Sequence, residues 1–125
     1  MPKPTNFEAM TDTEINRWAA ERDGFRRGGP NETDWVCEET GTGLPDNMLL
    51  DFAPDYATSA DAALGLAERW GFTIHSMHEY KNIGWEAYVC KLDVHRNHKG
   101  GDATFPRALL NALCAAKEAE EQVNE

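Results

Sequence analysis

The fold is decided by residues 56–92, YATSADAALGLAERWGFTIHSMHEYKNIGWEAYVCKL. Apolar side chains recur at helical spacing between Ala60 and Ala67, which predicts a helix with one buried stripe. Thr58 or Ser59 can cap the start of this helix through its hydroxyl group. Gly71 supplies the left-handed residue that commonly ends a helix, so the first part of the stretch predicts one complete, bounded helix.

The second part of the stretch predicts a β-hairpin. Its arms are Thr73–His78 and Trp85–Leu92, and its turn lies within Glu79–Gly84, where asparagine and glycine provide turn conformations. Both faces of the second arm carry apolar side chains, so we expect cover on both faces of the sheet. The predicted class is therefore α/β, more closely α+β: a small three-layer alpha/beta/alpha sandwich with three helices around a central, antiparallel, hairpin-based sheet.

Two further helices flank this unit. Thr11 begins a capping-box pattern, and Gly24 marks the end of the first helix. Thr104 can cap the third helix, whose buried stripe includes Leu109 and Leu113. We expect these two leucines to pack on the sheet.

The length of 125 residues predicts one domain. We assign residues 11–117 to that domain, residues 1–10 to a disordered lead-in and residues 118–125 to a frayed acidic tail. Three cysteines without paired spacing do not suggest a disulfide framework, and no apolar run reaches membrane-spanning length. These features predict a cytoplasmic protein without membrane contact.

The charge is strongly asymmetric. Twelve basic and 22 acidic residues give a net charge of −10, and no Lys or Arg occurs between Arg27 and Arg69. This pattern argues against direct nucleic-acid binding, which requires a basic footprint. An acidic loop beside an exposed aromatic residue instead favours a basic protein partner, although the charges could serve solubility alone. The predicted partner-binding residues are Trp35, Glu38, Glu39 and Asp46, and Tyr80 and Trp85 are also expected to be exposed.

A glycine-rich segment before the third helix suggests an alternative function. Free amides, glycine flexibility and a nearby lysine are the elements of an anion cradle, so this segment could hold a phosphorylated molecule or a nucleotide. Asp102 and Pro106 count against it, because one adds negative charge and the other lacks an amide donor. The candidate ligand-binding residues are Arg96, Lys99, Gly100, Gly101, Thr104 and Arg107.

Signals for catalysis are weaker. His95 and His98 lie three residues apart in a predicted polar loop, residues 95–102, and are weak candidates for metal binding, because a structural zinc site usually needs four spaced ligands. No serine lies in a nucleophile elbow. We therefore assign no catalytic residue and no cofactor, and favour a binding protein over an enzyme. A metal-dependent or other hydrolase is the third alternative.

Several segments resemble one known family. Residues 54–63, PDYATSADAA, are similar to the start of the second helix in the phage ABA sandwich domain family. The Trp70-Gly71-Phe72 junction, the arm that begins at Trp85, and residues 103–108 also resemble that family. So does a first helix that ends in Gly24-Phe25, where family members typically have glycine-tryptophan.

The resemblance covers residues 11 to about 117, and this chain departs from the family in its acidic loop and in residues 95–99. It implies a bacteriophage origin and an alpha/beta/alpha fold, and it implies no catalytic residue. Together these observations predict a non-enzymatic phage accessory protein in the cytoplasm of an infected bacterium. We expect its acidic surface to bind and inhibit a host defence or nucleic-acid-processing protein.

Overall fold

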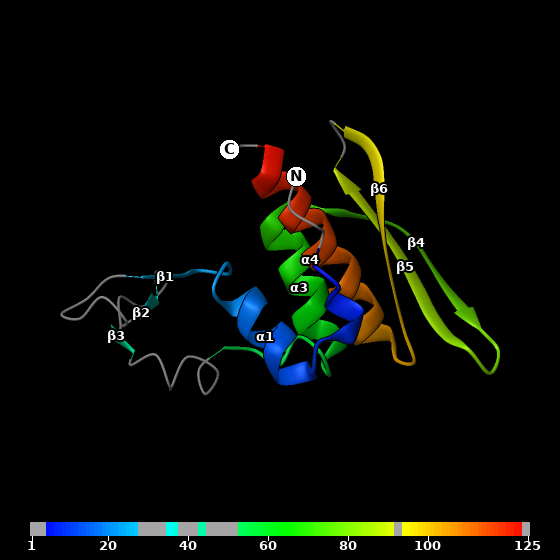
Figure 1. Cartoon of the computed structure of the whole chain (residues 1–125), viewed down its shortest axis with the longest axis horizontal. Helices are drawn as coiled ribbons and strands as arrows, with labels where there is room; N and C mark the ends of the chain where they lie inside the picture. The colour runs from blue at the N-terminus through cyan, green and yellow to red at the C-terminus, as the bar shows by residue number, and fades with distance from the viewer. Residues whose placement is uncertain (1–4, 28–34, 38–42, 45–52, 92–93, 124–125) are drawn as a thin grey trace.

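A computed structural model describes residues 5–27, 35–37, 43–44, 53–91 and 94–123 (Figure 1). Groups of three strands separate the helices along the chain, and the longest helix follows the last strand. In chain order the elements are the 3-10 turn η1 (Phe7–Ala9), α1 (Asp12–Ala20), β1 (Phe25–Arg27), β2 (Trp35–Cys37), β3 (Gly43–Leu44), α3 (Ala60–Trp70), β4 (Thr73–Tyr80), β5 (Gly84–Lys91), β6 (Val94–Asp102) and α4 (Phe105–Val123).

The larger sheet has the strand order β4-β5-β6, and both of its pairings are antiparallel. The predicted hairpin is confirmed as β4 and β5, and the α+β class with three helices and an antiparallel sheet is confirmed with it. Strands β1, β2 and β3 form a second, small antiparallel sheet. Figure 1 shows this small sheet beyond α1, on the side away from the hairpin.

The helix ends follow the local signals in the sequence. The capping box is present: the Thr11 hydroxyl accepts from the Glu14 amide at 3.1 Å, and the Glu14 carboxylate accepts from the Thr11 amide at 2.9 Å. The Ser59 hydroxyl caps α3 by accepting from the Ala62 amide. Gly71 ends α3 in the left-handed region, at a φ of 78°.

The prediction of a polar loop at residues 95–102 is wrong, because this segment lies in strand β6. Glycine and charged residues have low strand propensity, which hides the strand in the sequence. The fold nevertheless needs a residue without a side chain at Gly100. A Cβ atom there would lie 2.2 Å from the Ala112 nitrogen and 2.6 Å from the Ala108 oxygen, so β6 and the backbone of α4 are in direct contact.

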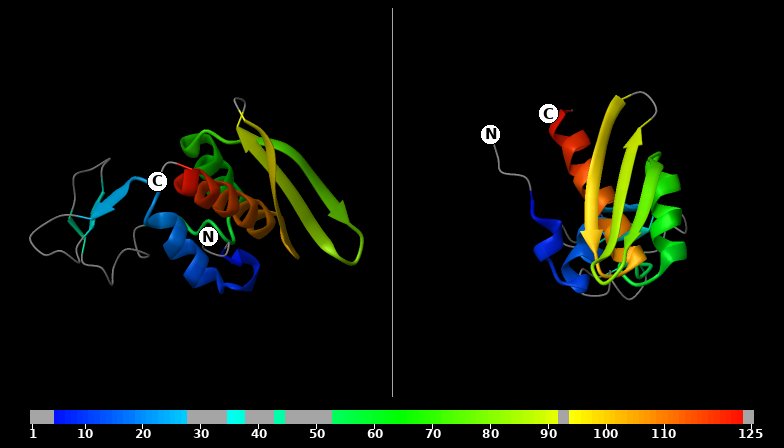
Figure 2. Two further views of the ribbon diagram at one scale, coloured as in Figure 1. Left: turned by 45° about the horizontal axis from the view of Figure 1, so that its top comes forward. Right: turned by 90° about the vertical axis from the view of Figure 1, so that its right-hand side faces the viewer.

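The helices are concentrated on one face of the larger sheet. Helix α4 packs on β5 and β6, and it buries Leu109 and Leu113 completely, as predicted. Figures 1 and 2 show α3 beside α4 on that same face, with α1 on the far side of both helices. Figures 1 and 2 show none of the described helices on the opposite face, where we expected cover as well.

Regular structure also occurs on both sides of residues 11–117, the range predicted for the domain. Phe7 is buried in the segment expected as a lead-in, and its ring meets Trp18 edge to face at 4.8 Å. At the other end, α4 continues to Val123, and Arg22 pairs with Glu121 at 2.8 Å. None of the described helices combines the length and apolar character needed to cross a lipid bilayer.

Candidate functional site

The helix-free side of the larger sheet is the best candidate for a binding surface. Ala87 and Val89 of β5 are fully buried toward the helices, so the alternate residues Glu86 and Tyr88 face the other way. Residues paired directly across an antiparallel sheet share a face. The strand register therefore defines what we call the open face: Ser76, His78 and Tyr80 of β4, Glu86 and Tyr88 of β5, and Lys99 of β6.

A hydrogen-bonded cluster occupies the centre of the open face. The Tyr88 hydroxyl donates to Glu86 Oε1 at 2.6 Å, and the Tyr80 hydroxyl reaches the same oxygen at 3.4 Å. Lys99 Nζ lies 3.0 Å from Glu86 Oε2. The hydrogen bond from Tyr88, followed by the one from Lys99, lowers the pKa of Glu86, while Glu86 raises the pKa values of Tyr88 and Lys99. The negative charge of Glu86 is thus balanced by Lys99 within the cluster.

Replacing Tyr88 by Phe should raise the pKa of Glu86, because the largest contribution to its lowered value is lost. The pKa can be followed through the side-chain carboxyl carbon by NMR. Replacing Tyr80 by Phe removes only the 3.4 Å contact and is the matched control, with a smaller expected shift. Identical Glu86 titrations in the native protein and the Tyr88→Phe variant would contradict the cluster.

The pKa shift of Glu86 also fixes the sign of its effect on stability. Because the folded state lowers this pKa from the ordinary value of 4.5, ionised Glu86 stabilises the fold at pH values above 4.5. That contribution disappears as the pH falls through the pKa of the folded state.

The hairpin turn continues the open face outward. Ile83 is 79% exposed and Tyr80 is 45% exposed. Asn82 holds a left-handed conformation, and a Cβ atom at Gly84 would lie 2.5 Å from the Asp102 carbonyl oxygen, so this turn requires glycine. The turn is therefore fixed by its contact with the end of β6 and presents its apolar side chains in a defined position.

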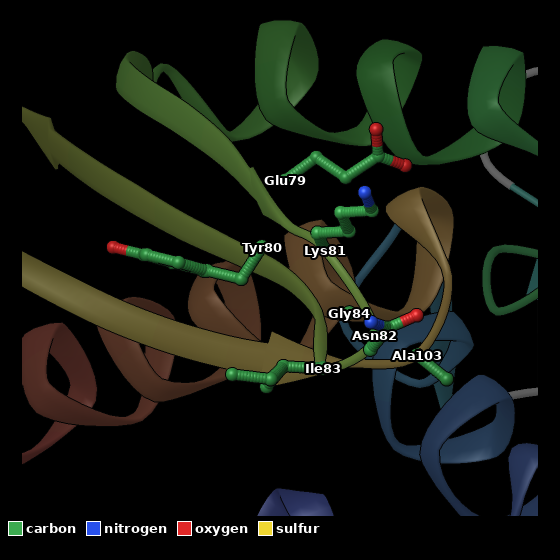
Figure 3. Close-up of a pocket in the computed structure, with 7 residues that line it drawn as sticks. All are labelled: Glu79, Tyr80, Lys81, Asn82, Ile83, Gly84 and Ala103. Atoms are coloured by element: carbon green, nitrogen blue, oxygen red, sulfur yellow. The ribbon is translucent and has the colours of Figure 1, made fainter.

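The surface at the hairpin turn is hollowed, with a cavity of about 660 Å³ lined by residues 79–84 and Ala103. Figure 3 shows Tyr80 and Ile83 leaving the hairpin on one side, while Glu79 and Lys81 leave it on the side of α3. The apolar and the charged side chains are thus separated. The apolar pair extends the open face.

The predicted anion cradle is not assembled. Lys99 lies on the open face, whereas Gly100 faces α4 and leaves no room beside it. The Gly101 amide donates to Glu8 Oε1 at 3.1 Å, and the Thr104 amide donates to the Asp102 carboxylate at 3.2 Å. These two donors are therefore already occupied.

The remaining cradle candidate with a described side chain is also engaged. Arg107 is buried, and its guanidinium group donates to the carbonyls of Phe7 and Met10, to Asp12 and to Asn111. It holds the N-terminal segment on α4 and does not face solvent. The side chain of Arg96 lies outside the described part of the structure.

The structure describes only Trp35 of the four residues predicted to bind a partner through the acidic loop. Trp35, expected as an exposed anchor, is 3% exposed, because it belongs to β2 and to the buried core. The other residues of this predicted site, Glu38, Glu39 and Asp46, lie outside the described residues. Trp85, also expected to be exposed, is half-buried and packs edge to face on Phe105 at 5.3 Å.

The metal candidates His95 and His98 lie on strand β6. Within the described ranges, no group of three or more His, Cys, Asp or Glu side chains is arranged to hold a metal ion.

No family model, curated protein or solved structure matches the chain. The resemblance to phage ABA sandwich domains therefore stays a prediction.

Sequence reasoning predicted an exposed Tyr80 but missed the open face as a unit. The cluster joins Tyr80, Glu86 and Tyr88 with Lys99, which was expected in a loop. Only the register of β6 brings that lysine next to Glu86. The available signal was the exposed Ile83 in a hairpin turn, since a large aliphatic side chain is unusual at such a position.

Proposed function

We propose that the protein acts by binding a protein partner on the open face and the adjoining hairpin turn. One observation carries the proposal. Only three large hydrophobic side chains of the described residues are exposed, and two of them, Tyr80 and Ile83, belong to this hairpin. Figure 1 shows the hairpin turn projecting away from the helices, where a partner can reach it.

The chemistry of the open face suits a protein partner. Tyrosine is enriched at interfaces because it buries a large ring while keeping a polar group for hydrogen bonding. Charged groups normally oppose burial, but Glu86 already has Lys99 and Tyr88 as partners. A partner covering this face would therefore bury paired groups, which costs less than burying a single charge.

The identity of the partner is proposed from charge and from the resemblance. A net charge of −10 would speed association with a basic protein by electrostatic steering. The resemblance to phage ABA sandwich domains favours a bacteriophage accessory protein whose partner is a host protein in the bacterial cytoplasm. Inhibition of a defence or nucleic-acid-processing factor is the role that we propose for such a complex.

Replacing Ile83 by Asp should lower recovery of the partner at least about tenfold, because it places a charge at the centre of the apolar contact. Partner proteins captured from a bacterial host lysate by the tagged chain would be quantified by mass spectrometry. Folding should change little, with a difference in free energy of unfolding below about 0.5 kcal/mol, because Ile83 is 79% exposed.

The matched control is Leu64→Asp on α3, the third exposed large hydrophobic residue, which is 40% exposed and lies outside the open face. Recovery from this variant should equal that of the native chain. Equal recovery with Ile83→Asp, or an equal loss in both variants, would contradict the proposed surface.

A further inference from the structure

The two outer strands of the larger sheet differ in how their edges are protected. At the β6 edge, the Gly101 amide donates to Glu8 Oε1 at 3.1 Å. The Gly101 carbonyl accepts from Asn111 Nδ2 at 2.9 Å. The turn η1 also lies against β6. Side chains and η1 therefore occupy this edge and prevent the addition of another strand.

The β4 edge has no comparable protection in the described part of the chain. From Ser76 to Tyr80, β4 pairs with β5 on one side, and no described residue forms a hydrogen bond with its backbone on the other. Alternate residues of an edge strand direct their N–H and C=O groups outward. The bulge between Ile74 and Ser76 interrupts the regular strand, so the receptive part of the edge is the five-residue segment Ser76–Tyr80.

We propose that the edge of β4 at Ser76–Tyr80 accepts an extended, basic segment of the partner as an added β-strand. This inference rests on the proposed function and assigns the class of ligand that the site takes. Backbone hydrogen bonds supply the affinity in this mode of recognition, and alternating side chains supply the specificity. The edge is continuous with the open face through Tyr80.

The charges at the edge select the occupant. Glu79 is exposed and forms no ion pair within the described structure. It pairs with Trp85 across the two strands and lies on the side of the sheet that faces the helices. An added strand would place a Lys or Arg beside it. The neighbouring residue of that strand would lie on the open face beside Tyr80, where an aromatic or aliphatic side chain fits. The expected ligand thus alternates basic and apolar residues.

A second copy of the chain is a poorer occupant of the same edge. Each copy carries a net charge of −10, so two copies repel each other. A basic partner segment is instead attracted by that charge. Charge complementarity therefore distinguishes a partner strand from self-association.

The probe is the synthetic peptide acetyl-KVKYKV-amide, titrated into the full-length protein with binding followed at the backbone amides by NMR. We expect amide shifts concentrated at Ser76–Tyr80. Two derivatives carry N-methyl groups on alternate residues: one is methylated at the odd-numbered positions of the peptide and the other at the even-numbered positions. An added strand bonds to β4 through only one set of alternate residues. One derivative should therefore bind at least about tenfold more weakly, and the other should bind like the parent peptide.

A charge reversal on the protein provides the matched test. Glu79→Lys should weaken binding of the parent peptide several-fold more than Glu68→Lys, which makes the same change on the exposed side of α3. No amide shifts along β4, equal affinity of both methylated peptides, or equal effects of the two variants would each overturn the added strand. So would shifts of the same amides without peptide as the protein concentration rises, because they would assign the edge to a second copy.

The peptide experiment and the partner-capture experiment can fail independently of each other. If partner capture depends on Ile83 but the peptide does not bind β4, the open face stands as the binding surface and the added strand is refuted. If the peptide binds β4 while capture is unaffected by Ile83→Asp, the open-face proposal fails instead.

Discussion

Replacing Gly100 by Ala is expected to destabilise the protein by about 3 kcal/mol or to prevent folding. The added Cβ atom would lie 2.2 Å from the Ala112 nitrogen and 2.6 Å from the Ala108 oxygen. Both are backbone atoms of α4, so no side-chain rotation can relieve the overlap. Strand β6 and α4 would have to separate, which would open the interface on which the core depends. Urea denaturation followed by far-UV circular dichroism measures the change.

Gly101→Ala is the matched control, one residue further along the same strand. Its Cβ atom would have its nearest neighbours at 3.6 Å, an ordinary contact distance. We expect a change below about 1 kcal/mol. Similar denaturation midpoints for the Gly100→Ala and Gly101→Ala variants would show that β6 and α4 are not in the close contact described.

Replacing Arg107 by Ala is expected to cost about 3 kcal/mol. Its guanidinium group donates to the Phe7 carbonyl at 2.8 Å and to the Met10 carbonyl at 2.6 Å, and it pairs with Asp12 at 2.5 Å. Without it, buried acceptors lose their donors, and the segment that places Phe7 in the core is released from α4. Thermal unfolding and limited proteolysis near the N-terminus would both report the loss.

Two variants separate this role from a loss of charge alone. Arg107→Lys keeps the charge, but the three donors on its single nitrogen cannot reproduce the four partners that the planar guanidinium group reaches, so it should recover only part of the stability. Lys99→Ala removes a solvent-exposed ion pair with Glu86 and should lower stability much less than Arg107→Ala does. An Arg107→Ala variant as stable as Lys99→Ala would contradict the buried network.

The features that the sequence predicted well depend on neighbouring residues. The capping box at Thr11, the Ser59 cap and the left-handed Gly71 all act within one turn of a helix. The hairpin of β4 and β5 likewise joins adjacent segments through a short turn. Such local signals are present in the sequence whatever the rest of the chain does.

The features that sequence reasoning missed depend on contacts between distant segments. Strand β6 has low intrinsic propensity, and Gly100 becomes necessary only when α4 lies against it. Arg107 looked like a free cation near a helix start, but residues about 100 positions earlier occupy it. Trp35 was expected beside solvent and is buried in the core. The candidate site changed for the same reason, since the open face exists only once β6 is placed next to β5.

The open face as a partner-binding surface is tested most directly by site-specific photo-crosslinking in the bacterial host. A photoreactive phenylalanine analogue would replace Ile83 in one sample and Leu64 in another, and crosslinked products would be identified by mass spectrometry. We expect a discrete crosslinked partner from position 83 and none from position 64, because only the former lies at the hairpin beside the open face. A partner crosslinked from position 64 alone, or none from position 83, would contradict it.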